Sequence, residues 1–247
     1  MEVTISRMFP YDHALLDLVR TTPQSVADVL RIMRKIDAVS VVGDGLKWFN
    51  GLYLQVTEVV ESRVVAGGFA DLDWLAELDV QFARLYFAAL ASSLTGQPAP
   101  GSWRVLFERR NQTAIARIQF ALAGINAHIN HDLPLALVAT CEATATTPEH
   151  GGVHYRDYTA LNATLDGLVE TAKTTLHVRL LGDALPAVSH LEDTIAAWGV
   201  SAAREKAWQN AGILWHVRAW PALSSTHLDT IDGLTTVVGK ALLVPVP

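Results

Sequence analysis

The chain has 247 residues, of which 50% are apolar and 18% are charged, and its formal net charge is −6. This composition excludes a disordered chain, which needs low hydrophobicity and high charge. The 19 basic residues against 25 acidic ones argue against a nucleic-acid partner, whose binding surface needs a basic stripe. A single cysteine, Cys141, excludes an intramolecular disulfide and a multi-cysteine metal site.

Targeting and membrane-spanning signals are absent from the sequence. The first apolar stretch is interrupted by Asp12 and Asp17 and follows no basic region, so it does not have the pattern of a signal peptide. No window contains the ~18 uncharged apolar residues that a membrane-spanning helix requires. We therefore expect a soluble, cytoplasmic protein with no membrane partner.

Apolar residues recur at helical spacing along almost the whole chain, which predicts an all-α fold. We expect one helical domain over residues 1–247, a multi-helix bundle with an N-terminal arm at about 1–22. Residues 38–42 (AVSVV) are the one stretch with an extended pattern. The predicted helices cover residues 24–37, 44–66, 72–95, 113–132, 134–142, 156–176, 188–198, 201–218 and 224–243.

Two loops interrupt the helical pattern. Residues 96–102 (GQPAPGS) contain two prolines and two glycines, and residues 142–154 (EATATTPEHGGVH) are small and polar. Apolar helices flank both loops, so neither is read as a linker between domains. Because loops of more than ~12 residues often act as lids, residues 142–155 are a candidate lid.

The segment over residues 115–141 is apolar on nearly all sides, which is typical of a buried central helix. Pro134 interrupts its hydrogen-bond ladder, because proline has no amide proton. We therefore expect a broken helix at the centre of the bundle.

Polar residues crowd this break. His128 and Asp132 are four residues apart, so on a helix the carboxylate can orient the imidazole. Asn126 and Asn130 follow one edge of the same helix. Burying so many polar groups destabilises a fold unless they satisfy one another. The cluster therefore indicates either a functional site or a structural polar network.

Three further helices carry polar residues on apolar faces. Asp79 and Tyr86 share the apolar stripe of the predicted helix 72–95, and a buried carboxylate must be paired, hydrogen-bonded or protonated. A structural ion pair is the alternative to a site role for Asp79. Tyr53 lies on the stripe of the helix 44–66, with Glu58 beside it.

The helix over residues 201–218 places Arg204 and Trp208 on one stripe. An arginine beside tryptophan indicates a stacked or paired guanidinium. Asp79 is a candidate partner for this arginine, and a purely structural core helix is the alternative.

Familiar catalytic motifs are missing. The sequence has no GxGxxG, GxxxxGK[ST], GxSxG or HExxH pattern, so no dinucleotide, phosphate-loop, serine-hydrolase or zinc-protease site is indicated.

Four strings resemble a large uncharacterised family, found mainly in actinobacteria and known only as a domain of unknown function. They are DGLKWFNGLYLQVTE, DWLAELDVQFARLYFAAL, QFALAGINAHINHDLPLALVATC and AREKAWQNAGILW. The resemblance covers roughly residues 25–245, and NAHINxDLP is its most specific part. Family members often carry Arg at the position of His131 and Asn at that of Arg84, which makes His131 a poor candidate for a shared catalytic role. The resemblance implies a stable helical domain and no particular activity.

The favoured function is a cofactor-independent, small-molecule enzyme of cyclase, isomerase or hydrolase type. His128, tuned by Asp132, would transfer a proton, with Asp79 as a third catalytic residue. Its substrate would be partly apolar, with a carbonyl or developing oxyanion held by polar side chains. The predicted substrate-binding residues are Asn126, Asn130, Tyr86, Tyr53, Arg204 and Trp208.

Two alternatives stay open. A divalent metal could be held by His128, Asp132, Glu58 and Asp79 in a hydrolase or oxygenase. The string HxxxD followed by Pro134–Leu135 is similar to a fragment of the all-helical zinc phosphoesterases, which implies the same alternative. The other is a non-enzymatic binding or scaffold protein, and a homo-oligomer is compatible with either.

Overall fold

The structure, a computed structural model, describes residues 8–177 and 199–245. Every regular element in these ranges is a helix, which confirms the predicted all-α fold. The elements are α1 (Asp12–Val19), α2 (Val26–Val39), α3 (Gly45–Val65), α4 (Leu72–Leu94), α5 (Gly101–Phe107), α6 (Arg117–Ala127), the π-helical turn η1 (His128–Asp132), α7 (Leu133–Ala143), α8 (Val153–Ala160), α9 (Asn162–His177), α11 (Val200–Val217) and α12 (Pro221–Leu242).

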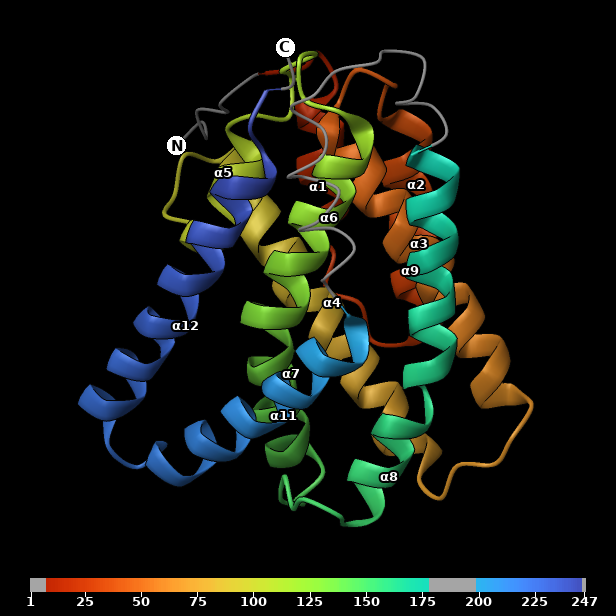
Figure 1. Cartoon of the computed structure of the whole chain (residues 1–247), viewed down its shortest axis with the longest axis vertical. Helices are drawn as coiled ribbons and strands as arrows, with labels where there is room; N and C mark the ends of the chain where they lie inside the picture. The colour runs from red at the N-terminus through yellow and green to blue at the C-terminus, as the bar shows by residue number, and fades with distance from the viewer. Residues whose placement is uncertain (1–7, 178–198, 246–247) are drawn as a thin grey trace.

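A broken central helix, formed by α6, η1 and α7, runs through the middle of the bundle (Figure 1). Helices α3 and α12 pack against α6, helices α4 and α11 pack against α7, and α4, α11 and α12 also contact η1. Every residue of α6 from Ile118 to Ala127 is buried. This burial explains why the segment is apolar on nearly all sides.

The break itself is a wide π-helical turn. The amide of Leu133 donates a hydrogen bond to the carbonyl of His128, five residues earlier. Pro134 follows in the first turn of α7, where its missing amide proton is tolerated best. Such π turns are frequent at functional sites.

The N-terminal residues differ from the predicted arm at 1–22. Their described part contains α1, whose Leu16 is buried in the core. The guanidinium of Arg110 pairs with the buried carboxylates of Asp12 (2.5 Å) and Asp44 (2.9 Å). Because one buried cation bridges two buried anions, this network ties α1 to the start of α3.

Helix α5 begins inside the predicted loop 96–102. The carboxylate of Asp232 on α12 accepts hydrogen bonds from the amides of Gly101 (2.7 Å) and Ser102 (2.9 Å). A carboxylate at a helix N-terminus satisfies free amides and favours the helix dipole. This cap comes from 130 residues away, so no local pattern reveals it.

Other boundaries also differ from the expectation. The predicted helix 156–176 is two helices, α8 and α9, that meet at Leu161. The predicted extended stretch 38–42 is not a strand: residues 38–39 end α2, and residues 40–44 form a loop with a turn at 42–43. The candidate lid is shorter, because α7 continues to Ala143 and α8 starts at Val153. The predicted helix 188–198 lies outside the described residues.

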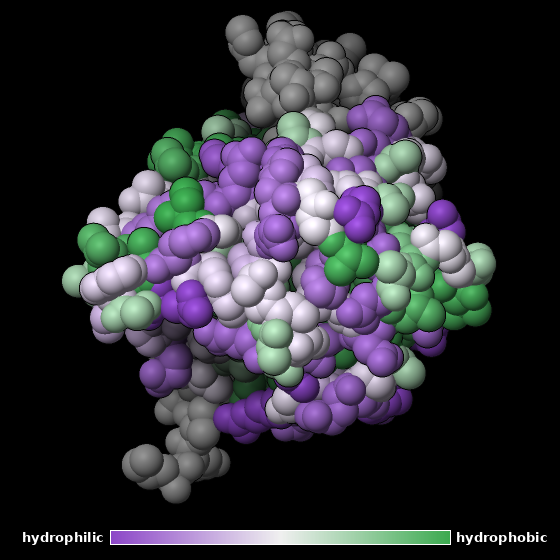
Figure 2. All heavy atoms as spheres, turned by 90° about the horizontal axis from the view of Figure 1, so that it is seen from below, coloured by the Kyte–Doolittle hydropathy of each residue, from purple (hydrophilic) through white to green (hydrophobic). Residues whose placement is uncertain are grey.

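The surface is mixed in character. The face in Figure 2 carries mostly hydrophilic side chains, with hydrophobic ones gathered towards its sides. Among the helices of residues 8–177 and 199–245, none combines the length and apolar character needed to span a membrane.

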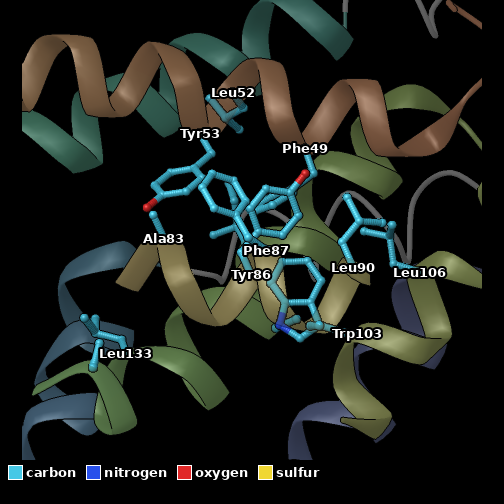
Figure 3. Packing of buried hydrophobic residues seen from close by; sticks show 14 of the residues in the cluster. Phe49, Leu52, Tyr53, Ala83, Tyr86, Phe87, Leu90, Trp103, Leu106 and Leu133 are labelled. Atoms are coloured by element: carbon cyan, nitrogen blue, oxygen red, sulfur yellow. The ribbon is translucent and has the colours of Figure 1, made fainter. Parts of the chain in front are cut away.

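Two glycines allow α3 and α6 to pack closely. A Cβ atom on Gly124 of α6 would collide with the ring of Phe49 on α3, and one on Gly45 with the ring of Phe120. Phe49 in turn packs beside Tyr86 in the aromatic core of Figure 3. The two glycines thus set the position of the helix that carries one wall of the pocket described below.

We predict that Gly124→Ala lowers the free energy of unfolding by about 1–3 kcal/mol, because the added methyl overpacks the core. Gly212→Ala is the control, since its Cβ would meet open space on α11 and alanine favours a helix by about 1 kcal/mol. Denaturant unfolding followed by circular dichroism measures both. Equal stability of the two variants would contradict this close packing.

Candidate functional site

A pocket of about 230 Å³ lies between α3, α4, α9, α11 and the central helix. Most of its walls are aliphatic or aromatic side chains, such as Val60, Leu78 and Leu165. A few polar side chains interrupt this apolar surface, and such a combination is typical of small-molecule sites. These polar residues are Tyr53, Thr57, Glu61, Asp79, His128 and Arg204.

His128 enters the pocket from η1. Its Nδ1 lies 3.0 Å from Oδ2 of Asp132, and because a carboxylate only accepts, Nδ1 carries the proton. The imidazole lies flat on the ring of Phe82, with centroids 3.4 Å apart, and the residue is 3% exposed. Its other nitrogen, Nε2, has no hydrogen-bond partner among the described residues. The geometry therefore leaves the Nε2 lone pair available to a molecule in the pocket.

The carboxylate of Asp132 holds His128 in place through the hydrogen bond to Nδ1. It also accepts hydrogen bonds from Nδ1 of His131 (2.8 Å) and Nε1 of Trp103 (2.9 Å). Burial raises the pKa of Asp132, but the hydrogen bonds from both histidines outweigh it and hold the pKa below its ordinary value. Three N–H donors thus stabilise a buried carboxylate.

The pKa values of the two histidines shift in opposite directions, although Asp132 raises both. Burial lowers the pKa of His128 and outweighs the contribution of Asp132. For His131, burial also lowers the pKa, but the hydrogen bond and charge of Asp132 outweigh it and raise the pKa. The environment therefore favours the neutral form of His128, whereas it favours the protonated form of His131.

Asp79 faces the same pocket from α4. Its Oδ2 is buried and has no hydrogen-bond partner in the part of the chain described. Burial, and then the negative charge of Glu61, raise the pKa of Asp79 to about 7. Near neutral pH, a carboxyl group with this pKa is protonated in a large share of the molecules, and the protonated form can donate a hydrogen bond.

Four polar atoms of this pocket make no hydrogen bond of ordinary geometry within the described residues: Tyr53 Oη, Thr57 Oγ1, Asp79 Oδ2 and His128 Nε2. Of these, the hydroxyls of Tyr53 and Thr57 lie near enough to affect each other. Most buried polar atoms in proteins are hydrogen-bonded, and each unsatisfied one costs about 1–3 kcal/mol. Four in one apolar cavity indicate that a bound molecule, either ordered water or a ligand, supplies the missing partners. The other unpartnered atoms among the described residues belong to Trp74, Ser102, Thr140, Trp208 and His227, which do not line the pocket.

Four residues predicted to bind substrate lie elsewhere: Tyr86, Asn126, Asn130 and Trp208. Tyr86 is fully buried behind the pocket, and its hydroxyl lies 3.4 Å from Oδ1 of Asn50. Asn126 donates a hydrogen bond to the carbonyl of Thr235 on α12 (2.9 Å) and accepts one from Asn130 (3.0 Å). Because successive helix residues turn by 100°, Asn126 and His128 face nearly opposite sides of the central helix. The two asparagines line a separate pocket of about 150 Å³ beside α12.

Arg204 lines the pocket, but it is not paired with Asp79 as predicted. Its guanidinium stacks 3.8 Å from the ring centre of Tyr158 and donates to Oδ1 of Asn162 and to the carbonyl of Tyr158. Trp208 does not line the pocket, because it is buried against Trp74. Sequence periodicity places a residue on a face, but it does not select the partner helix.

The four predicted metal ligands are not brought together. Glu58 points to the surface, where it pairs with Arg34 at 2.8 Å. Asp132 lies beneath His128 with its oxygens already hydrogen-bonded. Within residues 8–177 and 199–245, no group of three or more His, Cys, Asp or Glu side chains is placed to hold a metal ion.

Three contributors were assigned no site role from the sequence. Thr57 and Glu61 line the pocket with Tyr53, and their spacing of four residues on one helix face was the available signal. Trp103 carries no comparable signal, because its hydrogen bond joins it to Asp132 in another helix, 29 residues away.

Comparison with known proteins gives a family but no activity. Residues 26–245 match a family of unknown function, DUF5995. Among curated proteins, no match was found. Among solved structures, none was found either. The function therefore has to be inferred from the pocket.

We predict that Asp79→Asn stabilises the protein at pH 8 by up to about 4 kcal/mol, because each unit of pKa difference corresponds to about 1.4 kcal/mol. The folded pKa of Asp79, about 7, lies above the model-peptide value of 3.8. Its ionisation therefore opposes folding as the pH rises between these values. The gain should shrink towards pH 5. Urea unfolding at both pH values measures it, with Glu58→Gln, whose carboxylate lies outside the pocket, as the control for loss of one negative charge. A variant less stable than wild type at pH 8 would overturn this assignment.

Proposed function

The chain belongs to the DUF5995 family, which is defined without a function, and we propose from its pocket that it is a small-molecule enzyme using general acid/base chemistry. The observation that carries this proposal is the set of four buried, unpartnered polar atoms in one largely apolar cavity. The ligand would be mainly apolar, with a few polar groups that meet these atoms. Two titratable groups, His128 and Asp79, lie among the four.

His128 is the proposed base. Its Nε2 would take a proton from the bound molecule, and the negative charge of Asp132 would stabilise the resulting imidazolium. Asp132, Trp103 and His131 are positioning residues: Asp132 bonds Nδ1 of His128 and fixes its tautomer and orientation, and the other two residues bond Asp132 and hold it in place. A well-placed general base contributes about 10²–10⁴-fold to a rate.

Asp79 is the proposed acid. Its pKa is raised while that of His128 is lowered, so the two groups favour protonated carboxyl and neutral imidazole over the same pH range. Environments that separate two titratable groups in this way are typical of acid/base pairs. The apolar walls favour internal proton transfer, as in an isomerase or cyclase, over hydrolysis. Side chains alone carry this chemistry.

A non-catalytic carrier of apolar molecules is the second candidate. The predominance of aliphatic side chains in the pocket wall supports it, because burial of apolar surface alone can supply affinity. The proposal also keeps the cytoplasmic location expected from the sequence pattern, and the absence of a nucleic-acid partner, which rests on charge.

The test starts from ligands found by thermal-shift screening of small apolar compounds. Each ligand is incubated with protein in D₂O, and NMR follows deuterium incorporation and new products. We expect turnover by wild type and a loss of about 10²–10⁴-fold in His128→Gln, which removes the base. His216→Gln, on the exposed end of α11, is the matched control. Ligands that bind tightly but are never exchanged or converted would favour the carrier.

A further inference from the structure

Two hydrogen-bond donors share one side of the pocket. The hydroxyl of Tyr53 and Oδ2 of Asp79 are both buried and line the same cavity. They are near enough for the charge of Asp79 to raise the pKa of Tyr53, second only to burial. Neither has a hydrogen-bond partner within the described chain, so they do not bond to each other. Figure 3 shows the Tyr53 hydroxyl directed away from the Phe49 and Trp103 side of the aromatic cluster.

The base lies beside this pair. The ring of His128 packs against the ring of Tyr53, with centroids 4.4 Å apart. Phe82, on which His128 stacks, is three residues beyond Asp79 on α4. A molecule in the cavity can therefore face the Nε2 lone pair and the two donors at the same time.

We propose that Tyr53 and Asp79 form a subsite for the carbonyl oxygen of a mainly apolar ketone, whose adjacent C–H bond faces Nε2 of His128. This inference rests on the proposed function and names its substrate class. Because both donors are neutral when protonated, they suit an uncharged acceptor. A ligand carboxylate would be repelled by the charges of Glu61 and Asp132, and the guanidinium of Arg204 is already bonded to Asn162 and Tyr158.

The burial of both groups supports this assignment. Burial raises the pKa of Tyr53 well above its ordinary value, and burial followed by the charge of Glu61 raises that of Asp79 to about 7. Both groups therefore keep protons to donate. Donors already oriented in a water-poor cavity stabilise an oxygen that gains negative charge far better than water does.

The reaction step balances without a further reactant. Nε2 of His128 takes the proton from the carbon next to the carbonyl. The C–H electron pair forms a carbon–carbon double bond, and the carbonyl π pair moves to the oxygen, which accepts hydrogen bonds from Tyr53 and Asp79. Where the ketone carries a C=C bond beyond that carbon, return of the proton from Nε2 to the far carbon of the extended enolate yields the conjugated isomer and restores the base.

Three probes that share one ring skeleton test the subsite: 1-tetralone, tetralin and 1-aminotetralin. They carry a carbonyl, no polar group and a cationic amine, respectively. Calorimetry measures their affinities for wild type, Tyr53→Phe and Tyr155→Phe at pH 6. The second variant is the control, because the Tyr155 hydroxyl bonds Glu205 outside the pocket. Thermal melting checks that each variant is folded.

We expect wild type to bind 1-tetralone about 3- to 10-fold more tightly than tetralin, as one or two hydrogen bonds allow. Tyr53→Phe should reduce this preference, while Tyr155→Phe should keep it. Equal affinity for ketone and hydrocarbon would overturn the subsite. Tightest binding of the amine would also overturn it, and would make Asp79 and Glu61 a cation site.

Deuterium exchange separates this inference from the proposed function. With bound 1-tetralone in D₂O, exchange next to the carbonyl reports the base, and the affinity ratio reports the subsite. Preferential binding without exchange would sink the acid/base proposal and leave the subsite standing. Exchange without any preference for the ketone would overturn the subsite and leave the acid/base proposal standing. Failure of all three probes to bind would overturn both.

Discussion

The buried carboxylate of Asp132 is the constraint on which the site depends. An isolated buried charge costs several kcal/mol, so this one exists only because three N–H groups converge on it. They come from α5 and from two positions of the π turn. The same bonds fix the tautomer and direction of His128, and they require α5 to lie against the central helix. The same three hydrogen bonds therefore fix both the packing of α5 against the central helix and the orientation of His128.

Polar side chains on the two faces of the central helix differ in whether they have hydrogen-bond partners. Towards α12, the side-chain amides of Gln119 and Asn126 donate to main-chain carbonyls at 2.7–2.9 Å, and Asn130 bonds Asn126. These groups hold the helices in register. Towards α3 and α4, Nε2 of His128 and three further polar atoms of the pocket remain without partners among the described residues. A group of unsatisfied polar atoms in one cavity lowers stability, and such a cost is typical of a site kept for function.

Regular helices with a strong apolar stripe were predictable to within a few residues, such as α3 and α4. The pair His128 and Asp132 was predictable as well, because a spacing of four residues is read from a single helix. The short helix α5 was not, since Asp232 caps it from α12. The side of Asn126 was not either, because an apolar helix buried all round shows no preferred face. Tyr86 lies on the stripe of α4, but a stripe does not say which neighbouring helix a residue contacts.

The sequence by itself determined that this protein is helical, that its central helix is broken, and that a histidine and a carboxylate meet at the break. These features follow from local spacing and from the chemistry of proline. Only the tertiary structure decided which polar groups face the pocket. It placed Tyr53, Thr57 and Asp79 with His128 and left Glu58 at the surface. Such groupings depend on how separate helices pack, and pairing between helices is not written in the periodicity of any one of them.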